Sequence, residues 1–200
     1  MKTYHFKSVK NSDYVETNWR NGLGKTLELW KSPADSTNES FDWRISIAAI
    51  DASNDFSLYN NYNRSITQLN GGQMELYDEN LQFRHRLKIF EPYFFSGADK
   101  IFCELTLPQA HDFNVMTRSK VLTQNVECLS FSQDNLIKSI SVEKFCFIYA
   151  VKGSCKISDN EVIVEKNSAL ITADGVEIII NATEPGTVLM IACVTETMQT

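Results

Sequence analysis

Apolar residues recur along this chain in short runs rich in Val, Ile, Phe and Tyr, and Gly, Asn, Asp or Pro separates the runs at intervals of about ten residues. Convincing helical periodicity is missing from every window. In residues 41–50, odd and even positions are expected on opposite sides of a strand, with Trp43 facing one side and Arg44 the other. The pattern predicts an all-β protein.

The strand rhythm occurs twice along the chain. A strand, a glycine turn and a returning strand occupy residues 66–76 and again residues 147–157. In both halves a polar reversal, a further strand and a long apolar strand follow. This order is typical of a cupin-type jelly roll. We therefore predict a bicupin, in which two cupin-type jelly-roll β-barrels pack together in one chain, with the first barrel in residues 1–118 and the second in residues 119–200.

Charge and composition exclude several classes of partner. The 200 residues include 19 basic and 25 acidic side chains, and the net charge of −6 argues against nucleic acid as a partner. We find neither a secretory segment at the start of the chain nor an apolar stretch long enough to span a membrane, so a cytoplasmic protein is expected. The five cysteines form no close pairs and are expected to be reduced.

Histidine spacing argues against a metal. Cupin metal sites commonly use a His-x-His pair, a carboxylate and a further His, whereas this chain has only His5, His85 and His111, none of them two residues apart. We therefore expect no metal and no cofactor. An Asp or Glu could still act as a general acid or base.

The polar signature residues fall in four clusters within the first 120 positions, and the last 80 residues contain no comparable set. This asymmetry predicts a ligand pocket in the first barrel and a scaffold role for the second. An arginine at a barrel mouth is a natural two-point partner for a carboxylate, and amide and hydroxyl groups can add hydrogen bonds. The candidate ligand-binding residues are Arg64, Asn21, Thr26, Arg44, Trp19, Asp112, Asn114 and Met116.

Each candidate also has a structural interpretation. Arg44 could form an ion pair with Asp112 that ties strands together. Trp19 and Met116 could belong to the core, and Asp112 and Asn114 could satisfy backbone groups of a turn. For Arg64 the alternative is a solvated charge at the end of a strand.

The four clusters together resemble the HutD/Ves family of bacterial proteins. They read Trp19-Arg-Asn-Gly-Leu-Gly-Lys-Thr, Phe41-Asp-Trp-Arg-Ile-Ser, Phe56-Ser-Leu-Tyr followed by Arg64, and Asp112-Phe-Asn-Val-Met, in the order of the family. Leu23 departs from the pattern, because the family favours glycine there. The resemblance implies a bicupin without the usual cupin metal ligands, an association with histidine utilisation, and binding of a small acidic metabolite such as formylglutamate or urocanate, with a regulatory role and no firmly assigned catalytic activity.

The sequence thus predicts a metal-free bicupin that binds a small carboxylate-bearing metabolite. One alternative is an isomerase or hydrolase that uses Asp112 or Glu28 as a base beside Arg64. A second is an interaction protein in which the barrel is only a scaffold. The oligomeric state stays open, a homodimer included.

Overall fold

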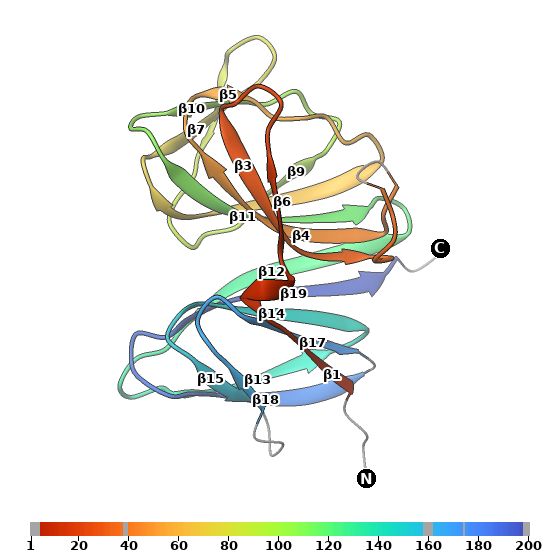
Figure 1. The fold of residues 1–200 in the computed structure, drawn as a ribbon, viewed down its shortest axis with the longest axis vertical. Helices are drawn as coiled ribbons and strands as arrows, with labels where there is room; N and C mark the ends of the chain where they lie inside the picture. Colours follow the sequence, from red (N-terminus) through yellow and green to blue (C-terminus); the bar gives the residue numbers. More distant parts are fainter. Residues whose placement is uncertain (1–4, 38–39, 158–161, 174, 198–200) are drawn as a thin grey trace. The chain divides into compact units, whose positions relative to one another are not determined.

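The structure, a computed structural model, describes residues 5–37, 40–157, 162–173 and 175–197. In these residues a single short 3₁₀ helix, Asn11–Asp13, accompanies the β-strands, which confirms the all-β prediction (Figure 1). None of their helices is long and apolar enough to cross a membrane. The chain divides into two compact units, one formed by Tyr14–Thr123 and the other by Met1–Asp13 together with Gln124–Thr200.

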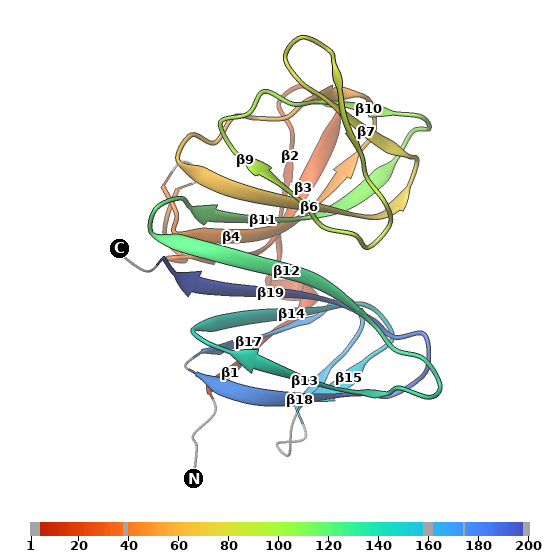
Figure 2. The same ribbon diagram turned by 180° about the vertical axis from the view of Figure 1, so that it is seen from behind.

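The unit of residues 14–123 contains two sheets. The six-stranded sheet has the order β2-β3-β4-β11-β6-β9, and its strands are labelled in Figure 2. The four-stranded sheet has the order β5-β10-β7-β8. The strands are β2 (Val15–Asn18), β3 (Gly24–Ser32), β4 (Trp43–Ile50), β5 (Asn54–Asp55), β6 (Tyr62–Gly71), β7 (Met74–Tyr77), β8 (Phe83–Arg86), β9 (Tyr93–Ser96), β10 (Phe102–Leu105) and β11 (Ala110–Arg118). Buried apolar side chains from both sheets, among them Ile50, Ile66, Leu76 and Cys103, form one core cluster.

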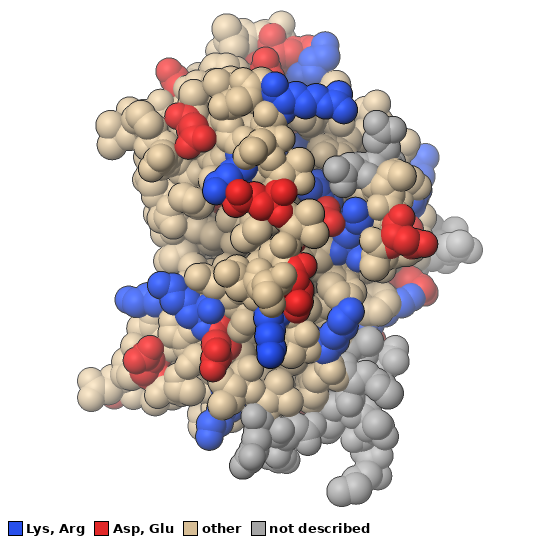
Figure 3. Space-filling view, in the orientation of Figure 1, with Lys and Arg blue, Asp and Glu red and all other residues tan. Residues whose placement is uncertain are grey.

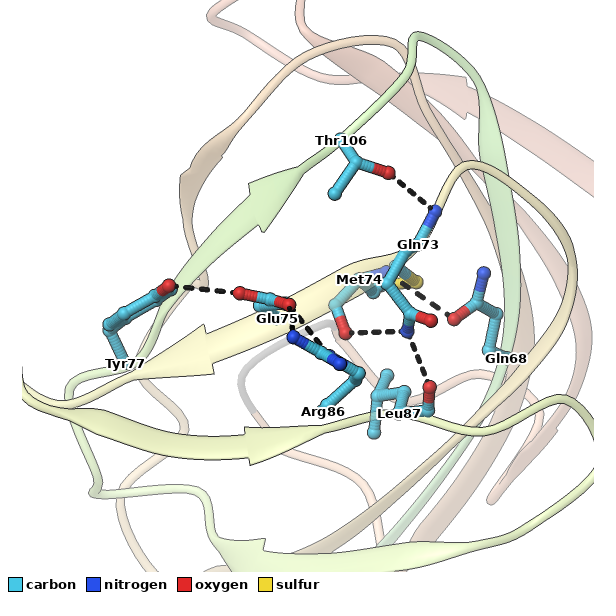
Figure 4. Close-up of polar contacts among 8 residues, drawn as sticks. All are labelled: Gln68, Gln73, Met74, Glu75, Tyr77, Arg86, Leu87 and Thr106. Carbon is cyan, nitrogen blue, oxygen red and sulfur yellow. Dashed lines mark hydrogen bonds and ion pairs between the residues drawn. The ribbon is translucent and has the colours of Figure 1, made fainter.

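Two glutamines hold the β6–β7 hairpin together (Figure 4). The Gln68 side chain donates to the Gly72 carbonyl at 2.7 Å and accepts from the Met74 amide at 3.4 Å. The Gln73 side chain donates to the Leu87 carbonyl at 2.5 Å and so joins the hairpin to the segment that follows β8. The amide group of Gln68 is therefore engaged in the turn.

The two faces of β7 differ in polarity. Met74 and Leu76 are fully buried, whereas Glu75 accepts from the Tyr77 hydroxyl at 3.0 Å and from Arg86 Nε at 2.7 Å (Figure 4). The hydrogen bond to Glu75 is the main cause that raises the pKa of Tyr77 to about 12. The ion pair between Glu75 and Arg86 is exposed, so we expect it to contribute little to stability.

The second unit also contains two sheets. Their orders are β1-β17-β14-β19-β12 and β13-β18-β15-β16. The strands are β1 (His5–Val9), β12 (Leu122–Ser130), β13 (Ile137–Val142), β14 (Phe145–Lys152), β15 (Cys155–Ile157), β16 (Val162–Val164), β17 (Ala169–Ala173), β18 (Val176–Ala182) and β19 (Val188–Glu196). Ile148, Leu170, Ile178 and Ile191 are fully buried in its core cluster.

The division differs from the predicted join after residue 118. Strand β1 pairs with β17 along five residues, from His5 opposite Ala173 to Val9 opposite Ala169, so the first 13 residues group with the second unit. Residues 119–123 group with the first unit. Strand pairing across the sequence, which local periodicity does not report, accounts for the first difference.

Candidate functional site

A cavity of about 540 Å³ lies in the unit of residues 14–123, and all eight predicted site residues border it. The six-stranded sheet, strand β5 of the four-stranded sheet and neighbouring loops supply its wall. Besides Arg64, Asn21, Thr26, Arg44, Trp19, Asp112, Asn114 and Met116, the wall includes Arg20, Ser46, Asp55, Phe56, Ser57 and Tyr59. The four sequence clusters therefore meet at one cavity.

The strand register explains why they meet. Strands β4, β11 and β6 are neighbours, and side chains two residues apart on one strand share a face. The register forms three rows on one face, which are Arg44–Met116–Arg64, Ser46–Asn114–Ile66 and Ala48–Asp112–Gln68. The predicted alternation in residues 41–50 is confirmed, because the even-numbered residues from Arg44 to Ile50 border the cavity.

Arg64 is held in a frame of aromatic rings. Its guanidinium carbon lies 5.5 Å from the ring centre of Phe56, 5.7 Å from that of Tyr59 and 4.9 Å from that of Phe95, which are distances of cation–π contact. The side chain is only 7% exposed, so it is not the solvated strand-end charge of the alternative interpretation. Burial lowers the pKa of Arg64 to about 10, which leaves the guanidinium charged at neutral pH.

The hydrogen bonds of Arg64 leave capacity for a ligand. Nη1 donates to the Ser57 carbonyl at 3.2 Å, and Nη2 donates to Asn114 Oδ1 at 3.3 Å. The buried Nε has no partner among the described residues. A guanidinium has five N–H donors. A carboxylate beside Arg64 could therefore accept a charge-assisted pair of hydrogen bonds.

Asp112 is a fully buried carboxyl group at the same wall. Asn114 Nδ2 donates to its Oδ1, while its Oδ2 has no partner among the described residues. Burial raises the pKa of Asp112 to about 7, although the charge of Arg64 and the hydrogen bond from Asn114 act in the opposite direction. Asp112 is therefore placed to change its protonation state near neutral pH.

Arg44 forms its ion pair with Glu28, and its proposed pairing with Asp112 was wrong. Arg44 Nε lies 2.7 Å from Glu28 Oε2, and Lys31 Nζ lies 3.3 Å from Glu28 Oε1. In the register Arg44 is opposite Met116, four residues along β11 from Asp112, which corresponds to about 13 Å of strand. Glu28 thus holds the Arg44 side chain in place and is shared with Lys31.

The glycine-containing turn between β2 and β3 shapes another part of the wall. Trp19 Nε1 donates to Thr26 Oγ1 at 2.8 Å across the hairpin. Asn21 Oδ1 accepts from the Leu23 amide at 3.0 Å, so this side chain also stabilises the turn itself. The Leu23 side chain is not among those that line the cavity. Leucine in place of the glycine that the family favours therefore adds no side chain to the cavity wall.

Met116 has a core role as well as a place at the wall. It is 5% exposed and clusters with Phe41 and Tyr62, whose ring centres lie 4.4 Å apart. The Tyr62 hydroxyl also donates to the Phe41 carbonyl at 2.8 Å. The interpretation of Met116 as a core residue is thus confirmed.

Four residues support the site in ways that the sequence did not indicate. Glu28, named as a possible base beside Arg64, instead pairs with Arg44 and is not among the residues that line the cavity. Phe56 and Tyr59 belong to the third sequence cluster, but the cluster did not indicate that their rings surround Arg64. Phe95 had no signal in the sequence, because it comes from β9, which pairs with β6.

The chemistry of the wall favours anions. Among the described lining residues are three arginines and two aspartates, with no His, Lys or Cys. In the part of the chain that the structure describes, no three His, Cys, Asp or Glu side chains are grouped as ligands for a metal ion. That the protein carries no metal remains a prediction.

Comparisons with known proteins agree with this architecture. The chain is similar to a solved protein of unknown function from Pseudomonas aeruginosa PAO1, with a TM-score of 0.84, 22% identity, and coverage of 95% of this chain and 98% of that chain. It is also similar to HutD from Pseudomonas fluorescens SBW25, with a TM-score of 0.80, 23% identity, and coverage of 96% of this chain and 100% of that chain. A cupin 2 conserved barrel domain protein from Leptotrichia buccalis is similar with a TM-score of 0.56 and 9% identity, and the match covers 90% of this chain and 96% of that chain. The fold is therefore cupin-like. The HutD family model matches residues 11–190, and the chain therefore belongs to the HutD family.

Proposed function

We propose that this protein is a metal-free bicupin whose N-terminal barrel binds a small carboxylate-bearing metabolite, while the C-terminal barrel is a scaffold. The observation that carries the proposal is Arg64, a buried cation framed by three aromatic rings at the wall of a cavity, with its Nε unpaired among the described residues. A buried cation with unused donors is costly unless an anion completes its hydrogen bonds.

The charges around the cavity support an anionic ligand. Arg44 has an ion-pair partner in Glu28, whereas the burial of Asp112 favours the uncharged form of the carboxyl group nearest in the network of Arg64. Because the overall charge is −6, the positive charge of Arg64 is opposite in sign to that of the protein as a whole. The apolar rings of Phe56 and Tyr59 lie beside Arg64, and surroundings of low polarity strengthen the interaction of a guanidinium with a bound carboxylate.

The family suggests which carboxylates to try. Membership of the HutD family supports a function associated with histidine utilisation. We propose an intermediate of histidine degradation, such as formylglutamate or urocanate, with a regulatory consequence of binding in the cytoplasm. A volume of about 540 Å³ is sufficient for molecules of this size.

A thermal-shift screen tests the proposal. The full chain is heated with formylglutamate, urocanate, acetate and an uncharged amide analogue of formylglutamate. A ligand at a hundred times its dissociation constant stabilises the folded state by about 2.7 kcal/mol, so carboxylates should raise Tm and the amide should not. If no carboxylate raises Tm and calorimetry detects no binding at millimolar concentration, the proposal is wrong.

Catalysis is the second candidate function, and one observation favours it. Asp112 has a raised pKa of about 7 and borders a cavity, which is a common property of a general acid or base. The test is to incubate each ligand from the screen with the protein and to follow its NMR spectrum. Turnover that disappears in Asp112→Asn would support an enzyme, and unchanged spectra would support binding alone.

A further inference from the structure

Arg64 and Asp112 are connected through one side chain. Asn114 Oδ1 accepts from Arg64 Nη2 at 3.3 Å, and Asn114 Nδ2 donates to Asp112 Oδ1. All three residues lie on one face of the sheet, on neighbouring strands β6 and β11. The carboxamide therefore joins a buried cation to a buried carboxyl group.

We propose that anion binding at Arg64 is coupled to uptake of one proton by Asp112, so that the cavity takes up a carboxylate together with a proton. The inference rests on the proposed function and adds to it the residue that regulates binding. Without a ligand, ionised Asp112 supplies a negative charge near Arg64. A bound carboxylate takes over that role, and its charge then disfavours a second negative charge on Asp112.

The atoms of Asp112 have distinct roles in this exchange. Oδ1 already accepts a hydrogen bond from Asn114, so the proton is expected on Oδ2, the buried atom that lacks a partner among the described residues. No bond of the ligand changes, because the proton comes from solvent and binds the carboxylate of Asp112.

Other charged groups near Asp112 do not supply an equivalent negative charge. Burial keeps the Cys103 thiol of β10 protonated, since its pKa lies far above neutrality. On β3, Glu28 is paired with Arg44 of β4 and with Lys31. Asp55 of β5 and Arg20 of the β2–β3 turn are exposed at the cavity wall, and the phenol of Tyr59 lies over Arg64. The ligand and Asp112 are thus the two groups that compete to balance Arg64.

The experiment measures the affinity for formylglutamate and for acetate by calorimetry between pH 6 and pH 9. Both probes remain ionised throughout this range, because carboxylic acids ordinarily titrate near pH 4. In the wild-type protein the affinity should fall above pH 7, approaching tenfold per pH unit. At pH 8, calorimetric titrations of the wild-type protein in Tris and in HEPES should show that the protein takes up protons when the ligand binds. This measurement needs no variant.

Asp112→Asn supplies the matched comparison. The amide is uncharged at every pH, so the affinity of this variant should not change between pH 6 and pH 9, and at pH 9 it should exceed that of the wild type. Asp51→Asn, a change of an exposed carboxylate outside the cavity wall, should retain the wild-type slope.

The outcomes separate this inference from the proposed function. Binding with a flat pH profile and no proton uptake overturns the inference and leaves anion binding at Arg64 intact. Proton uptake that persists in Asp112→Asn also overturns it, because another group would then be responsible. If neither probe binds to the wild type, the proposed function fails and the inference fails with it.

Discussion

Arg64 and Asp112 are both buried on one face of the six-stranded sheet, and burial has different consequences for their charges at neutral pH. Burial favours the uncharged form of both groups, but an arginine with a pKa of about 10 stays charged at neutral pH, whereas a carboxyl with a pKa of about 7 does not stay fully ionised. At the residue scale the pair of Arg64 and Asp112 therefore combines one permanent charge with one charge that changes near neutral pH.

Replacement of Arg64 should weaken ligand binding. Charge-assisted hydrogen bonds to a carboxylate contribute roughly 1.5 to 3 kcal/mol, so Arg64→Ala should lower affinity by about one to two orders of magnitude in calorimetry. Arg64→Lys should restore part of the loss, because an ammonium lacks the planar two-point geometry.

The matched control for Arg64 is Arg86→Ala. This variant removes an exposed arginine of β8 that pairs with Glu75 away from the cavity wall, and its affinity should equal that of the wild type. Equal affinity of Arg64→Ala and wild type would show that the ligand binds elsewhere.

Asp112 should also make stability depend on pH. Its pKa in the folded state is about 7 and its ordinary value is 3.8, so between these values only the folded state holds the proton. The contribution of Asp112 to the free energy of unfolding is therefore fully present below about pH 4 and is lost as the pH rises to 7. The total loss is roughly 3 to 5 kcal/mol.

The comparison of Asp112→Asn with wild type isolates this contribution. Urea denaturation at pH 5, 6, 7 and 8 should show that the stability of the variant relative to wild type increases with pH up to about 7 and then levels off. Asp51→Asn should show no such trend. A difference that is constant across the four pH values would contradict the raised pKa of Asp112.

At the scale of elements, strand pairing places segments that are distant in sequence beside one another. Among the described residues, β1 is an edge strand of its sheet and pairs with β17, while β17 pairs on its other side with β14. Val9, the last residue of β1, is 5% exposed and belongs among the buried apolar residues. Removal of β1 would leave one edge of β17 without its hydrogen-bonding partner.

Deletion of residues 1–9 should therefore destabilise the second unit locally. In hydrogen exchange, amides of residues 169–173 should lose protection, whereas amides of β6 and β11, in the other unit, should keep theirs. Val9→Ala, which retains the backbone pairing, should cause a smaller loss. Unchanged protection of residues 169–173 after the deletion would show that β1 contributes little to the sheet.

At the scale of the whole molecule, the net charge and its distribution bear on which partners are expected. Lys and Arg are interspersed with Asp and Glu on the face shown in Figure 3, where neither sign forms a continuous field. This distribution and the net charge of −6 fit the expectation that nucleic acid is not a partner. The proposed function depends instead on the positive charge of Arg64, which borders the cavity.

The whole chain should carry no stoichiometric transition metal. Only three histidines are present and none is spaced two residues from another, so the ligand set that cupins commonly use is incomplete. Elemental analysis of protein purified without an affinity tag should find far less than one zinc, iron or manganese per chain. About one metal per chain would overturn the metal-free interpretation.

Local alternation in the sequence determined the all-β class and the face on which each side chain of a strand lies, because successive residues of a strand point to opposite sides. It therefore placed Arg44 on the cavity face, and the sequence clusters identified all eight predicted wall residues. That these residues bind a ligand remains to be tested.

Tertiary structure alone decided which side chains meet. The fold paired the Arg44 side chain with Glu28 instead of Asp112, β9 brought Phe95 to Arg64, and β1 joined a sheet of the second unit. The pKa of Asp112 likewise depends on burial among strands far apart in sequence. Periodicity is a property of neighbouring residues, whereas register, burial and electrostatic environment depend on contacts between distant ones, so the sequence pattern did not contain them.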